Sequence, residues 1–196
     1  WWLLAYLVGA IPMGVLLARA KGIDLRTVGS GNIGATNAAR ALGTKLGLMV
    51  FVLDVLKAAF PVWLASAPWA LGGTADPSWA IAGVALFAVV GHIFPIYLRF
   101  AGGKGVACGL GIFVAIDPPI ALAAMAMYAQ GLWLTRTSAV GSLTAVTSIC
   151  MCLLIADKPP AYVALGLASA GLIWVRHVSN IRGLIADAKA RKRAQK

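Results

Sequence analysis

Long apolar segments, separated by short polar stretches, make up most of this 196-residue chain. A helix needs about 20 apolar residues to cross a hydrocarbon core of about 30 Å, and four of the segments reach or nearly reach that length. Hydrophobic residues make up 61% of the sequence, more than in soluble domains. The apolar segments cover residues 1–18, 46–66, 78–97, 106–117, 119–134, 140–156 and 160–175. The sequence therefore predicts an all-α integral membrane protein, a bundle of about seven transmembrane helices, with five crossings as the alternative.

One of these segments is too short to span an ordinary bilayer. Residues 106–117 would extend only about 18 Å as a helix. The segment ends at Asp117, which is followed by two prolines, and prolines end a helix. This helix is predicted to be short or re-entrant.

The basic residues predict an orientation. With the N-terminus outside and the crossings alternating, 15 of the 17 Lys and Arg lie on the inner side. This matches the positive-inside rule and puts the C-terminus in the cytoplasm. The outer loops hold Asp76, Asp117 and Asp157, with Lys158 as their basic residue. A net charge of +11 in a soluble protein would suggest nucleic acid, but cationic loops explain it here. We expect the lipid bilayer as partner, no nucleic acid, a basic tail over 189–196 that anchors to lipid headgroups, and a single domain over 1–196.

Three polar stretches interrupt the apolar pattern, and the first runs from Gly29 to Arg40. Its glycines fit a dinucleotide-binding spacing, but that motif needs a preceding strand, whereas membrane helices flank this one. Glycine backbone N–H groups and a helix starting near Thr36 would still bind an anion. Arg40 can grip phosphate with two hydrogen bonds. The predicted phosphate-binding residues here are Ser30, Gly31, Asn32, Gly34, Thr36 and Asn37; a loop with a helix cap is the alternative.

The second polar stretch combines His92 with a lysine set among glycines, Gly102, Gly103, Lys104 and Gly105. It is not a nucleotide P-loop, because Gly105 stands where Ser or Thr would bind magnesium. Lys104 is predicted to clamp a phosphate, aided by the glycine backbone. His92 is expected to orient a hydrogen-bonding partner.

The third polar stretch places His177 and Asn180 three residues apart, on one face of a helix. Polar residues at the membrane boundary are candidates for function, with an interfacial His and a helix-terminal Asn as the alternative. Asp54 and Lys57 show the same spacing inside an apolar segment, where we expect them to neutralise each other. Their support for the site stays open. Cys108, Cys150 and Cys152 lack a metal-binding spacing and are expected to be buried thiols. No metal and no cofactor are expected.

Together these stretches resemble the bacterial acyl-phosphate–glycerol-3-phosphate acyltransferase family. The family's first motif, Ser-Gly-Asn-x-Gly-Ala-Thr-Asn-x-x-Arg, matches residues 30–40 in full. Its second motif matches residues 91–95 and 100–107, and the start of its third, Arg-His-x-x-Asn-Ile, matches residues 176–181. The end of the third motif departs from the family, since Gly183 and Lys189 replace an expected arginine and glutamate. The loop after the fifth segment has Ala139 in place of a common serine, although Ser142 matches.

The resemblance implies a membrane enzyme that moves a fatty acyl group from acyl phosphate to the 1-hydroxyl of glycerol 3-phosphate. The products would be lysophosphatidic acid and phosphate, at an early step of phospholipid biosynthesis. The catalytic residues implied are His177, Asn180, Lys104, Arg40 and Ser142. The absence of Asp and Glu from the motifs favours a substrate phosphate over His177 as the base. We expect an acyl groove among apolar helices, an active site facing the cytoplasm at the bacterial inner membrane, a monomer, and functional coupling to the enzyme that makes acyl phosphate.

The alternative is a transporter or binding protein for a phosphorylated solute, because basic clamps in a helical bundle would serve that role too. A transporter is expected to show repeated halves with sites at the midplane, which this sequence lacks. An acyl-CoA-type acyltransferase would need His-x-x-x-x-Asp. His92 is followed at that spacing by Tyr97, and His177 by Arg182.

Overall fold

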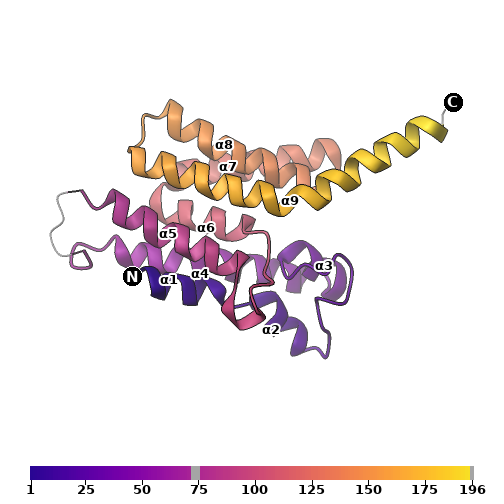
Figure 1. Cartoon of the computed structure of the whole chain (residues 1–196), viewed down its shortest axis with the longest axis horizontal. Helices are drawn as coiled ribbons and strands as arrows, with labels where there is room; N and C mark the ends of the chain where they lie inside the picture. Colours follow the sequence, from indigo (N-terminus) through magenta and orange to yellow (C-terminus); the bar gives the residue numbers. More distant parts are fainter. Residues whose placement is uncertain (72–75, 195–196) are drawn as a thin grey trace.

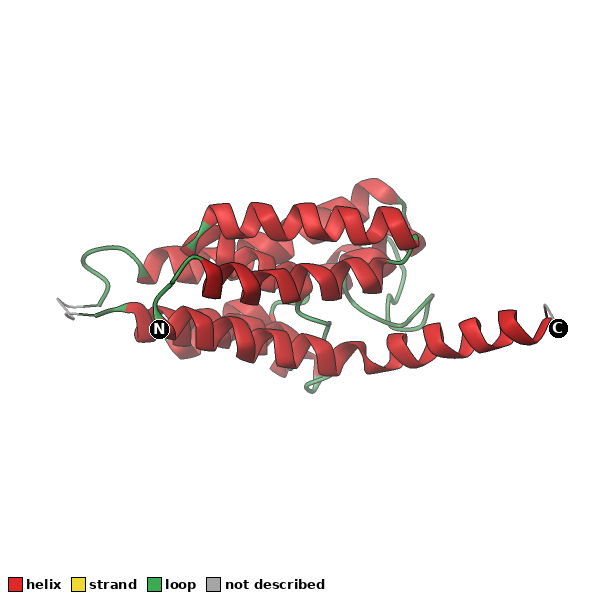
Figure 2. Cartoon of the chain, turned by 90° about the horizontal axis from the view of Figure 1, so that it is seen from above, coloured by secondary structure: helices red, strands yellow, loops and turns green. Residues whose placement is uncertain are grey.

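The computed structural model describes residues 1–71 and 76–194, and all regular secondary structure in these ranges is helical (Figure 1). The helices are α1 (Trp2–Ala10), α2 (Met13–Arg19), α3 (Ala35–Leu42), α4 (Thr44–Ala65), α5 (Ser78–Ile93), the 3₁₀ turn η1 (Ile96–Leu98), α6 (Val106–Ile116), α7 (Pro118–Thr135), α8 (Ser138–Ile155) and α9 (Pro160–Ala194). The long helices run roughly alongside one another, and the C-terminal part of α9 projects beyond the bundle (Figures 1 and 2). The predicted all-helical class is confirmed.

Five segments of the described chain are long and apolar enough to cross a membrane. They are Trp2–Arg19, Thr44–Ala65, Ser78–Leu98, Ser138–Ile155 and Pro160–Ala190. α6 is apolar but shorter, as predicted, and it ends directly before Asp117. α7 is long, but it is not among these five spans. Helices form over all seven predicted segments, whereas the number of crossings and their direction stay predictions.

The first segment is two helices rather than one. Pro12 lies between α1 and α2, where proline has no N–H to continue the helical ladder. In an apolar environment a main-chain carbonyl at such a break needs a partner. The carbonyl of Ile11 accepts a hydrogen bond from Lys57 Nζ at 2.6 Å. The break therefore brings a polar backbone group to a buried lysine.

The largest core is built from small and branched side chains shared among α1 and α4–α9. Its fully buried members include Ala5, Val62, Val84, Ile112 and Leu153. Small residues let helices approach closely, which is the main source of packing between helices in lipid. Large apolar side chains such as Trp63, Leu122 and Ile155 instead lie exposed on the outside of the bundle. That distribution suits a protein surrounded by hydrocarbon.

The loops gather at two opposite ends of the bundle. At one end Lys158 Nζ lies 2.6 Å from Asp117 Oδ2, joining the loop before α7 to the loop before α9. Both belong to the predicted outer loops. At the other end lie the long loop between α2 and α3, the loop between α5 and α6, and the turn between α7 and α8 (Figure 1). The three polar stretches meet at this second end.

Candidate active site

A single cavity of about 1090 Å³ unites residues from all three polar stretches. The five predicted catalytic residues line it: Arg40, Lys104, Ser142, His177 and Asn180. Of the predicted phosphate-binding residues, Ser30, Asn32, Gly34, Thr36, Asn37, His92 and Gly105 line it too. The predicted residues Gly31, Gly102 and Gly103 are not among its lining residues. These residues come from α3, α5, α8, α9 and the connecting loops.

The loop before α3 is organised by the side chain of Asn37. Its Nδ2 donates to the carbonyls of Leu25 (3.1 Å), Val28 (3.0 Å) and Asn32 (2.9 Å), and its Oδ1 accepts from Ser30 N at 2.9 Å. Asn37 is only 2% exposed. Its amide is thus engaged with the loop backbone rather than with the cavity. We interpret Asn37 as the residue that shapes the first motif.

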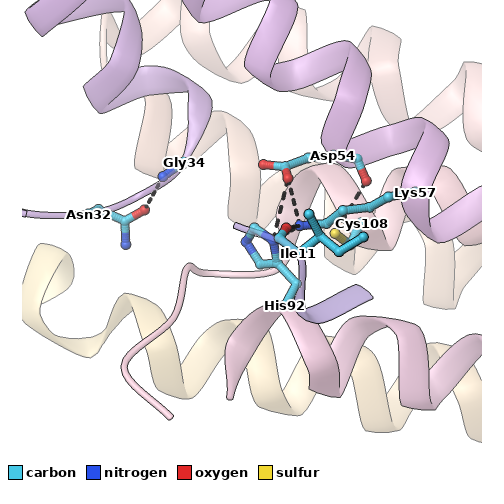
Figure 3. Close-up of polar contacts among 7 residues, drawn as sticks. All are labelled: Ile11, Asn32, Gly34, Asp54, Lys57, His92 and Cys108. Carbon is cyan, nitrogen blue, oxygen red and sulfur yellow. Dashed lines mark hydrogen bonds and ion pairs between the residues drawn. The ribbon is translucent and has the colours of Figure 1, made fainter. Parts of the chain in front are cut away.

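Helix α3 begins at Ala35, next to the predicted start at Thr36. Asn32 Oδ1 accepts from Gly34 N at 2.9 Å, one residue before the helix (Figure 3). Arg40 lies in the last turn of α3 and is exposed at the cavity. Its guanidinium is therefore available to an anion from the solvent side.

The glycine loop after η1 is fixed from two sides. Gly103 N donates to the main-chain carbonyl of His92 at 3.1 Å. Arg176 donates from Nη2 to Gly102 O at 2.8 Å and from Nε to Gly103 O at 3.2 Å. Gly105 then starts α6 with φ +87°, a conformation that glycine adopts without strain. The loop is held in one shape with Lys104 at its centre.

Lys104 meets the third polar stretch directly. Its ammonium donates to Asn180 Oδ1 at 2.5 Å. Lys104 is half-buried, and burial, followed by the positive charges of Arg176 and Arg40, lowers its pKa below the ordinary value of 10.5. The positive charges of Lys104, Arg176 and Arg40 repel one another, and a bound phosphate would offset this repulsion. The predicted phosphate clamp therefore has the electrostatics of an anion site.

His177 is 1% exposed and lines the cavity. Its Nδ1 lies 2.8 Å from the carbonyl of Ile173, which can only accept, so we assign the proton to Nδ1. Nε2 is then unprotonated and can accept a hydrogen bond. A main-chain carbonyl orients this ring, a role that the sequence had led us to expect only from Asp or Glu.

Hydroxyl groups surround the turn between α7 and α8. Ser142 Oγ donates to Ser138 O at 2.9 Å, and Ser142 is 5% exposed. Ser138 Oγ lies 3.0 Å from Tyr128 Oη and 3.2 Å from Thr36 Oγ1. This chain of hydroxyls connects the start of α8 to the first motif. Ala139 is buried beside it.

Away from the charged groups the cavity becomes apolar. Its walls there come from α4 and α6–α9 and include Phe51, Phe113, Leu132, Ile149 and Ile173. A cavity that is cationic at one part and apolar at another fits an amphiphilic molecule. An acyl chain attached to an anionic head has that character.

Sequence reasoning missed two residues of this site. Arg176 belongs to the third motif, but no role was predicted for it, and it braces the glycine loop. Ser138 is the first residue of α8 and belongs to no motif, and the contacts of its side chain become visible only in three dimensions. An arginine beside His177 could have been suspected from spacing, whereas nothing in the sequence indicated Ser138.

The predicted pairing of Asp54 with Lys57 is confirmed, with Lys57 Nζ 2.8 Å from Asp54 Oδ1. In the described ranges, one group of potential metal ligands occurs: Asp54, His92 and Cys108, whose ligand atoms lie within 4.8 Å of one another. The Lys57 ammonium bonds to two members of this group and would repel a metal cation. The group is better explained as a hydrogen-bonded cluster around a lysine.

The altered end of the third motif lies on the projecting part of α9. Arg182, Gly183 and Lys189 are exposed there. A Cβ added at Gly183 would meet no atom within 4 Å. These departures from the family pattern are therefore away from the packed core of the site.

Comparisons with known proteins identify the family of this chain. The family model described as Glycerol-3-phosphate acyltransferase matches residues 1–187. The glycerol-3-phosphate acyltransferase of Anaeromyxobacter dehalogenans strain 2CP-1 is 51% identical over 183 residues, covering 92% of this chain and 90% of the relative. That of Aquifex aeolicus strain VF5 is 38% identical over 187 residues, covering 95% of each.

Two crystal structures share the fold. One is PlsY (YgiH), an integral membrane glycerol 3-phosphate acyltransferase, in its glycerol 3-phosphate form, with a TM-score of 0.89 and 38% identity. The other is the lysophosphatidic acid form, with a TM-score of 0.87 and 36% identity. Each match covers 95% of this chain and 90% of the other. This chain is a multi-pass membrane protein and belongs to the glycerol-3-phosphate acyltransferase family.

Proposed function

We propose that this protein transfers a fatty acyl group from acyl phosphate to the 1-hydroxyl of glycerol 3-phosphate, giving lysophosphatidic acid and phosphate. The observation that carries the proposal is the contact between Lys104 and Asn180, beside Arg40 and His177, in a cavity with apolar walls. Both substrates carry a phosphate, and one carries an acyl chain. The cavity offers cations for the phosphates and an apolar region for the chain.

The chemistry needs little from the protein beyond placement and charge. The 1-hydroxyl oxygen attacks the carbonyl carbon of acyl phosphate, the new ester C–O bond forms, and the C–O bond to the phosphate breaks. Phosphate is a good leaving group, so no covalent enzyme intermediate is required. Holding two anions together in the correct orientation supplies most of the rate enhancement. Lys104 and Arg40 would offset the charge of the two phosphates.

The proton of the 1-hydroxyl needs an acceptor. His177 holds its own proton on Nδ1, so Nε2 can accept a hydrogen bond from the hydroxyl and orient it. We propose that the leaving phosphate finally takes the proton, because it gains negative charge as the bond breaks. Asn180 and Ser142 would hold glycerol 3-phosphate beside His177. Ser30, Thr36 and the backbone of the glycine loops would contribute further donors.

We further propose that the protein works as one domain over residues 1–196 and as a monomer in the bacterial inner membrane, with this site facing the cytoplasm. The basic loops around the site support that orientation. Acyl phosphate is a reactive mixed anhydride, which makes functional coupling to the enzyme that produces it advantageous.

Turnover by purified protein in lipid or detergent tests the proposal. Labelled glycerol 3-phosphate is supplied with palmitoyl phosphate and, in parallel, with palmitoyl-CoA. We expect labelled lysophosphatidic acid from the acyl phosphate alone. Product from palmitoyl-CoA alone would contradict the proposed donor. Folded protein that makes no product from either donor, yet moves glycerol 3-phosphate into vesicles, would support a transporter instead.

A further inference from the structure

Figure 3 shows a charged cluster of Asp54, Lys57 and His92. The cluster is buried, and His92 contacts the glycine loop at Gly103. Lys57 on α4 is 5% exposed, and its ammonium has three N–H groups. Three acceptors surround it: Ile11 O at 2.6 Å, Asp54 Oδ1 at 2.8 Å and His92 Nδ1 at 3.1 Å. The ammonium therefore donates to Ile11 O and His92 Nδ1 and forms an ion pair with Asp54 Oδ1.

This arrangement determines where His92 carries its proton. An ammonium can only donate, so Nδ1 of His92 accepts from Lys57 and is unprotonated. Asp54 Oδ1 lies 3.7 Å from the same Nδ1, too far for a hydrogen bond. We assign the proton to Nε2. His92 and His177 then hold opposite tautomers.

The Nε2–H of His92 lies against the glycine loop. A Cβ built on Gly103 would come within 2.1 Å of His92 Nε2, so the ring and the loop backbone are in contact. His92 also lines the cavity. In residues 1–71 and 76–194, Nε2 of His92 forms no hydrogen bond to a protein acceptor, whereas Nδ1 is bonded to Lys57. The cluster thus presents one N–H donor beside Lys104 without a protein acceptor.

The ion pair is costly for a purely structural role. A buried charge pair is often no more stabilising than apolar side chains of the same size, and a charge inside a membrane protein marks a functional position by default. Asp54 and Lys57 are 2% and 5% exposed, in the middle of an apolar helix. A leucine and a methionine would fill this space without desolvating any charge. What they could not supply are donors to Ile11 O and to His92 Nδ1.

We propose that Asp54 and Lys57 are positioning residues, which hold His92 as the Nε2–H tautomer so that it donates a hydrogen bond to an anionic substrate oxygen at the glycine loop. This inference rests on the proposed function for the identity of the anion. Lys57 sets the tautomer, the ion pair with Asp54 holds the Lys57 ammonium in place, and the contact with Gly103 aims the ring. The neutral His92 ring thus places a directed N–H donor beside Lys104, and it adds no positive charge to the site.

The first test needs no turnover. The chain has only two histidines, so ¹⁵N-histidine labelling gives two rings, assigned with His177→Gln. In wild-type protein we expect His92 as the Nε2–H form and His177 as the Nδ1–H form. In the double variant Asp54→Leu, Lys57→Met, the His92 ring should become a mixture of tautomers. Wild-type His92 with its proton on Nδ1 would overturn the proposal, even if the protein proves not to be an acyltransferase.

The second test separates positioning from general damage. A glutamine amide places an N–H near the Nε2 position and needs no partner at Nδ1, whereas an asparagine amide reaches only the Nδ1 position. His92→Gln should retain at least about tenfold more kcat/KM than His92→Asn, since a hydrogen bond to a charged group is involved. The double variant Asp54→Leu, Lys57→Met should lose about tenfold or more in kcat/KM when His92 is present. In a protein that already carries His92→Gln, the same two substitutions should lower kcat/KM only slightly.

Two controls complete the design. Cys108 belongs to the same cluster but donates only to the main-chain carbonyl of Asp54, at 3.3 Å, so Cys108→Ala should leave kcat/KM and the His92 tautomer unchanged. Thermal midpoints identify variants that fold poorly. The losses in kcat/KM from His92→Gln and from the pair Asp54→Leu, Lys57→Met multiply in the triple variant only if Lys57 does not act through His92. Equal kcat/KM values for His92→Gln and His92→Asn would contradict the proposal as well.

Discussion

The ammonium of Lys104 donates to Asn180 Oδ1 across 76 residues of sequence and thereby joins the glycine loop to α9. Neither residue can be moved without disturbing the other. The contact also places a positive charge beside the His177 ring, which lies on the same helix as Asn180. The proposed phosphate clamp and the residues proposed to orient the hydroxyl are thus connected by a hydrogen bond.

Removing the lysine charge should therefore abolish most of the activity. We expect Lys104→Met to lower kcat about 10²- to 10³-fold, as for the loss of one main electrostatic donor. A steady-state assay with acyl phosphate measures this change in kcat. Lys45→Met, another lysine on the same side of the bundle that does not line the cavity, is the control and should keep nearly full activity.

The fall in rate at alkaline pH should reflect the loss of the proton from Lys104. Its pKa is lowered by burial and by Arg176 and Arg40, so the lysine loses its proton at a lower pH than a free lysine. Its attraction for phosphate is present at neutral pH and is lost as the pH rises, with a midpoint below 10.5. Lys104→Arg should move this fall in rate to higher pH. An unchanged fall in that variant would assign it to another group.

Arg176 should matter through the shape of the glycine loop. Its guanidinium bonds two successive carbonyls, Gly102 O and Gly103 O, a fork that lysine cannot reproduce. We expect both Arg176→Lys and Arg176→Ala to raise the KM for acyl phosphate by about tenfold or more. Full activity in the lysine variant would mean that charge alone, and not the fork, is required.

Gly103 should tolerate no side chain, because a Cβ would lie 2.1 Å from His92 Nε2. Gly103→Ala must displace either the histidine ring or the loop, and we expect a loss of activity of at least about 10²-fold. The matched control is Gly183→Ala, where a Cβ meets no atom within 4 Å. Equal activity of the two variants would contradict the geometry of the loop.

Asn37 should contribute mainly to stability. Asn37→Ala removes an amide whose two N–H groups are shared among three loop carbonyls and whose Oδ1 accepts from Ser30 N. We expect the free energy of unfolding to fall by about 2 to 4 kcal/mol, with a thermal midpoint lower by several degrees. Faster hydrogen exchange should be confined to the loop before α3. Asn32→Ala removes one hydrogen bond of its side chain, to Gly34 N, and should have a smaller effect.

His177 should be needed for the chemical step. We expect His177→Ala to lower kcat about 10²-fold with a smaller change in KM, because the attacking hydroxyl loses its orienting acceptor. A variant with the wild-type rate would remove His177 from the mechanism. A loss confined to KM would limit its role to binding.

The sequence by itself determined the class of the protein, and it predicted most of the site residues that line the cavity. Apolar segments of the length of a bilayer can satisfy their backbone only as helices, and that physical constraint is visible in composition and length alone. Residues such as Lys104, His177 and Asn180 were identifiable because polar groups are costly in such segments and stand out from them. The short helix before Asp117 was predictable because proline excludes helical geometry locally.

The tertiary structure alone decided what each polar group faces. Asn37 and Arg40 lie in one motif, yet the amide of Asn37 is engaged with the loop backbone while Arg40 is exposed at the cavity. The acceptor of His177 is a carbonyl, which every residue carries, so no sequence pattern could reveal it. The donor to His92 comes from α4, 35 residues away, and that distance is closed only by packing α4 against α5. Hydrogen-bond direction depends on relative orientation, and orientation is set by the packing of the whole bundle.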